Sequence, residues 1–328
     1  SGIDVEADFL PVDPFWNDAR TAFGDPATWD LLVPDEVVVS EQMARQTLEP
    51  LSAHATSHGI DLDDWLPAGI ETFTRDGEVF GIPYVAMSNV LIYRHDLLEE
   101  FGISVPTTWD DLRLAALDAQ RALRMSGRND VAGFASRGRA GYGHNFWILG
   151  STMFPSWGWE WDRGPGHPPL VNSREAADAL TYYAALLREA GPRYADQLTF
   201  TDTHVLYRDG KAVFLLDTAT ELATMRREGP ESAGHASRMT VVPTGPTGRP
   251  EPGLFTPAYC IPASSNEKDA AVRLLAHLTS SAEVLADTVG GGYAEPARQS
   301  IMDSEEYGIS FAADFRETLL ETRQNARV

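Results

Sequence analysis

The apolar positions along this chain follow two different periods, which predicts a mixture of strands and helices. Residues 3–9 alternate apolar and acidic side chains, a period of two that predicts a half-buried strand. Residues 29–33 form a short apolar run, which is typical of an inner parallel strand. Residues 85–93 form a second apolar run, and residues 239–242 a third. The chain therefore combines strands with longer helical segments.

One stretch, residues 76–112, carries the densest series of local signals. Asp76-Gly77 predicts a tight turn between two strands, and the apolar strand 85–93 follows it. A short helix is expected over 95–101. Thr108, with Asp111 three residues later, predicts the N-terminus of a longer helix that stops at Gly127.

Two further helices are predicted from their capping residues. Asn172, with Glu175 three residues on, opens a helix that ends at Gly191-Pro192. Its expected buried face consists of Ala176, Leu180, Tyr183 and Leu187. Ser280 and Glu283 open the next helix, which the glycines at 290–292 terminate.

Composition narrows the class of protein. The chain has 328 residues, of which 43% are hydrophobic and 23% charged, so two folded domains are expected. The net charge of −22 repels phosphate backbones, which argues against nucleic-acid binding. Cys260 is the single cysteine and lies in an apolar run, so we expect an inert buried thiol.

The order of motifs resembles the extracellular solute-binding proteins of ABC importers, family 1, which include maltose-binding-protein-like sugar binders. Residues 76–83 match D-G-x-x-x-G-[IV]-P, and residues 102–112 match G-I-x-x-P-x-T-W-D-[DE]-L. Residues 207–214 match F-x-x-G-K-[AV]-A-[MF], with Asp217 and Thr218 at the far end of the strand that follows. Residues 293–300 resemble G-x-x-P-x-R-x-S.

This resemblance implies an α/β, two-lobed periplasmic-binding-protein-like fold (type II) with a hinge between the lobes. Lobe one would comprise residues 1–90 with 257–303, and lobe two residues 91–256 with 304–328. The sequence has no counterpart of the family's first strand and helix, or of its last helices.

The resemblance also implies the function. An extracytoplasmic protein of this kind, located at the cell surface, lipid-anchored or in the periplasm, captures a carbohydrate in an interlobe cleft. We expect a di- or oligosaccharide as ligand, the permease subunits of an ABC transporter as partners, a monomeric state, and neither cofactor nor metal. No signal sequence is present in these residues.

A sugar site pairs flat aromatic rings with carboxylates, amides and arginine, because sugars present C–H faces and a rim of hydroxyls. Asp35 and Glu36 follow the run 29–33, and ligands of α/β sheets bind beyond the carboxyl ends of strands. The three glycines at 290–292 permit a close backbone approach to a ligand or merely stop a helix. The expected ligand contacts are Trp16, Asp35, Glu36, Tyr84, Asn145, Trp147, Trp157, Trp159, Asp217, Phe255, Tyr259, Gly291, Tyr293 and Arg298.

Several alternatives stay open at this point. A lone tryptophan is more often part of a core than a sugar platform, and a charged pair after a strand is more often a solvated turn. A carbohydrate-active enzyme that uses cleft carboxylates such as Asp35 and Asp217 is the competing class, although no hydrolase motif is present. The third reading keeps the binding fold and changes the ligand to a polyamine, a metal chelate or a peptide.

Overall fold

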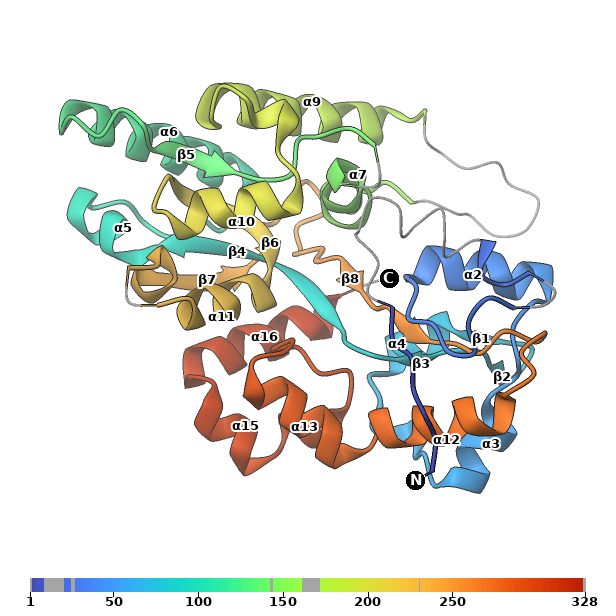
Figure 1. The fold of residues 1–328 in the computed structure, drawn as a ribbon. Helices are drawn as coiled ribbons and strands as arrows, with labels where there is room; N and C mark the ends of the chain where they lie inside the picture. Colours follow the sequence, from blue (N-terminus) through green and yellow to red (C-terminus); the bar gives the residue numbers. More distant parts are fainter. Residues whose placement is uncertain are drawn as a thin grey trace. The chain divides into compact units, whose positions relative to one another are not determined.

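The computed structural model describes residues 2–8, 21–24, 27–141, 144–160, 172–229 and 231–326 (Figure 1). The chain divides into two compact units, each with its own core. Unit 1 contains the described residues up to Met87 together with Phe255–Phe311, and unit 2 contains Ser88–Leu254 together with the described residues from Ala312 onward. The predicted lobe boundaries differ from these by a few residues and stay a prediction.

Unit 2 is built on a mixed sheet with strand order β5-β6-β4-β7, and β8 also pairs with β4. These strands are β4 (Met87–Arg94), β5 (Ala132–Ala135), β6 (Ala212–Thr218), β7 (Ser237–Val241) and β8 (Leu254–Phe255). Strands β5 and β6 run parallel, whereas β4 is antiparallel to both β6 and β7. Every residue of β6 is buried, as expected for an inner strand.

Helices α6 and α9 pack on β5, and α11 and α16 pack on β7 (Figure 1). The α-helices of this unit are α5 (His95–Phe101), α6 (Trp109–Met125), α7 (His144–Ile148), α8 (Phe154–Ser156), α9 (Arg174–Ala190), α10 (Phe200–Arg208), α11 (Ala219–Arg227) and α16 (Ala313–Asn325). A π-helical turn, η2 (Leu149–Met153), joins α7 to α8, and the 3₁₀ turns are η3 (Ala195–Gln197) and η4 (Ala233–Ala236).

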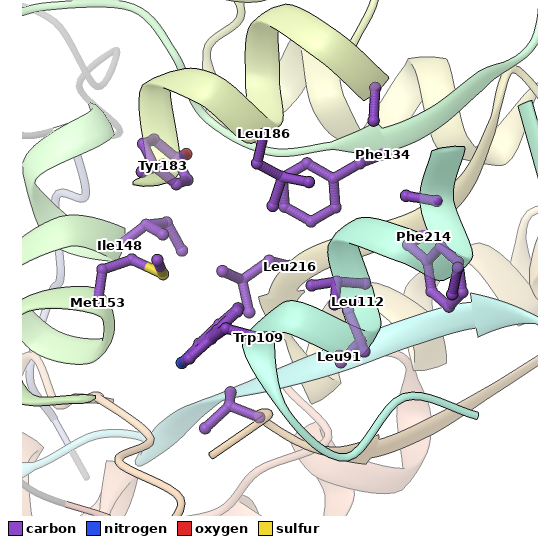
Figure 2. Packing of buried hydrophobic residues seen from close by; sticks show 14 of the residues in the cluster. Leu91, Trp109, Leu112, Phe134, Ile148, Met153, Tyr183, Leu186, Phe214 and Leu216 are labelled. Atoms are coloured by element: carbon purple, nitrogen blue, oxygen red, sulfur yellow. The ribbon is translucent and has the colours of Figure 1, made fainter. Parts of the chain in front are cut away.

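The core of unit 2 lies between the sheet and these helices (Figure 2). Side chains from both strands and helices meet there, among them Leu91, Trp109, Phe134, Tyr183 and Leu216. Trp109 is 2% exposed, which confirms its structural role at the start of α6. Full burial of one large apolar side chain contributes about 1.5–3 kcal/mol, so this layer supplies much of the stability of unit 2.

Unit 1 is assembled from short strands and helices. The hairpin β1 (Thr74–Arg75) and β2 (Glu78–Val79) turns at Asp76-Gly77, and β3 (Ile82–Pro83) pairs antiparallel with β9 (Ala258–Tyr259). The helices are α2 (Glu36–Arg45), α3 (Ser52–His58), the 3₁₀ turn η1 (Leu62–Asp64), α4 (Pro67–Thr72), α12 (Lys268–Leu278), α13 (Ser281–Gly290), α14 (Gln299–Met302) and α15 (Glu305–Ser310).

Most of the capping predictions are confirmed. Thr108 accepts a hydrogen bond from the Asp111 N–H at 3.1 Å, and the Asp111 carboxylate accepts one from the Thr108 N–H at 3.1 Å. Such a capping box is worth about 1 kcal/mol. Ser280 caps α13, and Gly291 ends it with a φ of 124°. Cys260 is buried, and burial raises the pKa of its thiol.

Two predicted strands are wrong. Residues 2–8 carry no strand, and Val5 is 57% exposed. Residues 29–33 form only one ladder contact, an antiparallel bridge between Leu32 and Cys260. The physical reason is that a strand requires a neighbouring edge to pair with, and a period of two or an apolar run cannot reveal whether that edge exists.

The predicted start and buried face of α9 also need correction. Ser173, not Asn172, caps the helix, because its hydroxyl accepts from the Ala176 N–H at 3.1 Å. Leu180 is 48% exposed, while Ala179 and Leu186 are buried. The face that packs on β5 is therefore rotated relative to the predicted one, and its small residues allow close packing.

Candidate functional site

In unit 2, polar side chains gather where the parallel strands β5 and β6 end. The carboxyl ends of parallel strands lie at the same edge of a sheet, and this brings Arg137, just after β5, to Asp217 near the end of β6. Arg137 Nε donates to Asp217 Oδ2 at 3.0 Å, and Nη2 donates to Oδ1 at 2.5 Å. This bidentate ion pair fixes both side chains, and Asp217 is only 1% exposed.

Aromatic rings surround the Arg137 guanidinium. Its central carbon lies 4.5 Å from the ring centroid of Trp147 and 5.5 Å from that of Phe200. The Tyr183 hydroxyl donates to the Arg137 carbonyl at 2.7 Å. Cation–π attraction and the tyrosine bond therefore hold the side chain and the backbone of this arginine in place.

A second polar cluster lies at the start of β4 in the same unit. The Asn89 side chain donates from Nδ2 to Thr152 Oγ1 at 2.7 Å and to Ser151 Oγ at 3.2 Å. The Gly253 N–H donates to the same Thr152 oxygen at 3.0 Å, and a Cβ on Gly253 would lie 2.1 Å from Ser151 Oγ. The π-helical turn presents Ser151 and Thr152 to this cluster, and such turns are frequent at functional sites.

The predicted aromatic contacts of unit 2 occupy different environments. Trp159 is 6% exposed and belongs to the core, with its ring 5.2 Å from Phe154. Trp157 is partly buried, and its ring lies 5.1 Å from Tyr182. Asn145 is half-buried on α7, the helix that also carries Trp147. The sequence pattern could not distinguish these environments.

In unit 1, the predicted acidic pair begins helix α2. Asp35 caps the helix and accepts a hydrogen bond from the Val38 N–H at 2.8 Å. Glu36 is half-buried, and its Oε2 accepts from the Thr256 N–H at 3.4 Å. Burial, followed by the neighbouring Asp35 charge, raises the pKa of Glu36 to about 8. Glu36 is therefore protonated, and neutral, near pH 7.

Three of the predicted tyrosines come together in unit 1. The Tyr84 ring makes edge contacts with Tyr259 at 5.4 Å and with Tyr293 at 5.6 Å between centroids. Tyr84 and Tyr259 line a pocket of about 200 Å³, together with Asp287 and Glu283 of α13. Burial, with a smaller contribution from Asp287, raises the pKa of Tyr259 to about 12. The Tyr259 hydroxyl is therefore neutral near pH 7 and able to donate a hydrogen bond.

The glycines after α13 shape the rim of this tyrosine cluster. Gly291 adopts a φ of 124°, and a Cβ there would meet no heavy atom within 4 Å. A Cβ on Gly292 would instead lie 2.4 Å from the Asp287 carboxylate oxygens. Gly292 thus leaves room for Asp287, whose Oδ2 lies 3.5 Å from the Tyr84 hydroxyl.

Arg298 participates in a network elsewhere in unit 1. It donates to Asp64 Oδ2 at 2.6 Å and to the Thr279 carbonyl at 2.6 Å, and it lies over the Trp65 ring at 4.5 Å. Burial alone would raise the pKa of Asp64, but hydrogen bonds from Ser300 and Arg298 bring it below its ordinary value. The protein itself thus occupies much of the hydrogen-bonding capacity of Arg298.

The structure brings some of the predicted ligand contacts together in three groups and places the others elsewhere. Asp35 and Glu36 lie at one helix start, Tyr84, Tyr259 and Tyr293 form one cluster, and Trp147 adjoins Asp217 through Arg137. Phe255 lies in β8, and Trp16 falls outside the described residues.

Sequence reasoning missed Arg137 and Asp287. Arg137 follows the buried strand β5 as Asp35 follows the run 29–33, so the same rule would have found it. Asp287 lies within a helix, and no spacing signals its contact with tyrosines from other parts of the chain.

The described residues contain no group of three or more His, Cys, Asp or Glu side chains placed to hold a metal ion. No helix in the described part of the chain is long and apolar enough to cross a membrane. The constellations above instead combine aromatic rings, hydroxyls, amides and an arginine, a set suited to hydrogen-bonding a small hydroxylated molecule.

This α/β architecture is that of the two-lobed binding proteins. The chain matches maltose-bound T. maritima MalE3 with a TM-score of 0.79 and 24% identity over 95% of this chain and 76% of that one. The predicted fold class is thereby confirmed. The family Bacterial extracellular solute-binding protein matches residues 2–313, and the chain belongs to this family.

Individual relatives are 22–28% identical to this chain. The mannitol-binding protein of Pseudomonas aeruginosa is 28% identical over 285 residues, which are 85% of this chain and 62% of that protein. A solute-binding protein of Agrobacterium vitis with bound D-mannitol is 25% identical, with a TM-score of 0.80 over 95% of this chain and 73% of that one. The erythritol/L-threitol-binding protein of Mycolicibacterium smegmatis is 22% identical over 93% of this chain and 66% of its own length. The chain thus spans less than two thirds of either curated relative.

Proposed function

We propose that this chain is the ligand-capturing part of an extracytoplasmic solute-binding protein that delivers an acyclic polyol, or a sugar of similar size, to the membrane subunits of an ABC importer. The observation that carries the proposal is the repeated occurrence of mannitol: the 28% identical relative is named for it, and the 25% identical structure contains it. Membership of the solute-binding family supports a role in binding without bond chemistry. We propose two lobes, 1–90 with 257–303 and 91–256 with 304–328.

The chemistry of the clusters fits a neutral hydroxylated ligand. The pocket of about 200 Å³ is smaller than the roughly 300–1,000 Å³ of pockets for drug-sized ligands. It offers tyrosine rings for C–H contacts and Asp287 and Glu283 as acceptors for hydroxyl donors. We propose that ligand-binding residues are among the contacts predicted from the sequence.

Di- and oligosaccharides are the second candidate class of ligand. Solved structures with the same fold contain maltose or acarbose, each at less than 25% identity, so they support the fold alone. A polyamine is the least favoured ligand, because the 28% identical relative is named for mannitol and the 25% identical structure contains it, and mannitol is uncharged. Our proposal therefore places polyols first, di- and oligosaccharides second and cations last.

The test is a thermal-shift and calorimetric screen of the purified chain against D-mannitol, ribitol, D-tagatose, maltose and spermidine. A ligand at a hundred times its dissociation constant adds about 2.7 kcal/mol to the unfolding free energy, which gives a clear rise in melting temperature. We expect the largest rise with a polyol, and chromatography should recover that polyol unchanged.

A matched pair of variants sharpens this screen. Tyr293→Ala removes a ring of the tyrosine cluster that is 39% exposed, and Ile309→Ala removes an apolar side chain that is 78% exposed elsewhere in unit 1. We expect Tyr293→Ala alone to weaken polyol binding. A rise only with spermidine, or a chemically altered polyol, would refute the proposal.

A further inference from the structure

Arg137 was not among the ligand contacts predicted from the sequence, and the proposed function does not yet assign it a role. Its side chain is 14% exposed at the carboxyl ends of β5 and β6. Nε and Nη2 are both committed to Asp217. Among the described residues none accepts a hydrogen bond from Nη1, so this partly exposed cation retains donor capacity.

Its partner Asp217 is fully engaged. Oδ1 accepts from Arg137 Nη2 at 2.5 Å and from the Thr218 N–H at 2.9 Å, and Oδ2 accepts from Arg137 Nε at 3.0 Å. With 1% of its surface exposed, this carboxylate has little access to a ligand. Its role is to orient the guanidinium.

The remaining neighbours hold the arginine rigid. The Trp147 and Phe200 rings lie within 4.5 Å and 5.5 Å of the guanidinium carbon, and Tyr183 anchors the backbone. Rigid donors lose little conformational entropy when a ligand binds, so they add affinity and select geometry. This is the construction expected of a specificity element.

We propose that Arg137 determines the ligand specificity of unit 2: its Nη1, the guanidinium nitrogen not bonded to Asp217, donates to a hydroxyl oxygen of the polyol, and Asp217 acts as the positioning residue. This inference rests on the proposed function. The ion pair carries no net charge, so the site favours a neutral hydroxyl over an anion or a cation.

The experiment compares D-mannitol with deoxyhexitols that each lack one hydroxyl, using calorimetry on wild type, Arg137→Met, Arg137→Lys and Asp217→Asn. A hydrogen bond to a charged group is worth roughly 1.5–3 kcal/mol, so Arg137→Met should weaken D-mannitol binding roughly 10- to 150-fold. A site built to bind one hydroxyl rejects the analogue without it. Arg137→Met should therefore also lose the discrimination that wild type shows against one deoxyhexitol.

The positioning role of Asp217 has its own readout. Asp217→Asn should reduce the same discrimination, and combining it with Arg137→Met should add little further loss of affinity, because both changes disable one unit. Arg94→Met is the matched control, since Arg94 makes the same bidentate pair with Asp96, with Nε at 2.8 Å and Nη2 at 2.6 Å. This control should leave binding unchanged.

The outcomes separate the two proposals. If wild type binds no polyol, the proposed function fails and this inference fails with it. If wild type binds D-mannitol and Arg137→Met retains both affinity and discrimination, only the inference is overturned. Should Arg137→Met not fold, the discrimination measured with Arg137→Lys decides, because lysine keeps the charge and loses the planar fork.

Discussion

The candidate clusters of the two units are built differently. In unit 2, charged and polar side chains bond to one another: Arg137 is paired with Asp217, and Asn89 Nδ2 donates to Ser151 and Thr152. In unit 1, three tyrosine rings contact one another, two of them line a pocket, and burial raises the pKa of Glu36 at the start of α2.

Under the proposed function, this difference would give two ways of presenting hydrogen-bond donors to a neutral ligand. Unit 2 fixes a permanent cation by pairing it, which costs little reorganisation on binding. Unit 1 uses hydroxyls and a protonated carboxyl, whose donor capacity depends on pH. The two units should therefore differ in their tolerance of added side-chain atoms and in the pH dependence of their stability. Three substitutions test this difference.

The largest effect is expected from Gly253→Ala in unit 2. The new Cβ would lie 2.1 Å from Ser151 Oγ and 2.9 Å from Asn89 Nδ2, both held by hydrogen bonds. Overpacking of this kind should lower the unfolding free energy by about 3 kcal/mol. Thermal unfolding measures it, and Ser151→Gly in the same chain should restore part of the loss. An unchanged melting temperature would show that this cluster is not tightly packed.

Glu36→Gln in unit 1 should have a pH-dependent effect. The pKa of Glu36 is raised from 4.5 to about 8 in the folded chain, so folding favours the protonated form. The stability that this form provides is fully present below pH 4.5, declines as pH rises, and is lost above about pH 8. The glutamine variant should therefore exceed wild type by on the order of 2 kcal/mol at pH 9.

The measurement is chemical denaturation of both proteins from pH 4.5 to pH 9. Glu78→Gln is the control, because Glu78 is an exposed glutamate of β2 in the same unit. The curves for wild type and Glu36→Gln should converge at the acid end of the series. Parallel curves across the whole range would contradict a raised pKa.

The smallest effect is expected from Gly291→Ala in unit 1, the same chemical change as at Gly253. No atom lies within 4 Å of the new Cβ, so only the backbone strain at a φ of 124° remains. That strain should cost about 1 kcal/mol, measured by thermal unfolding. A loss equal to that of Gly253→Ala would remove the contrast in packing between the two units.

Local signals predicted many elements of the fold. The capping residues Thr108 and Ser280 and the turn at Asp76-Gly77 act over three or four residues, so their consequences are visible in the sequence itself. The strand predicted at 3–9 failed because pairing depends on a distant edge. Leu180 was misplaced because a helix with several small residues can bury more than one face.

The candidate site was only partly predictable for a related reason. Residue type and position suggested Tyr84, Tyr259 and Tyr293, but no pattern indicated that their rings touch. Asp217 was predicted as a ligand contact, and the structure pairs it with Arg137, which follows strand β5 and lies 80 residues away in the sequence. Contacts between distant segments depend on how elements pack, which single-sequence patterns do not encode.

The family, the α/β class and the capped helices were predictable from the sequence, because motif order and local hydrogen bonding are properties of short segments. The pairing of charges, the contacts between rings and the raised pKa of Glu36 emerged only from the folded structure. Those outcomes depend on burial and on atoms from remote segments, since desolvation and pairing energies are set by the three-dimensional environment of each group.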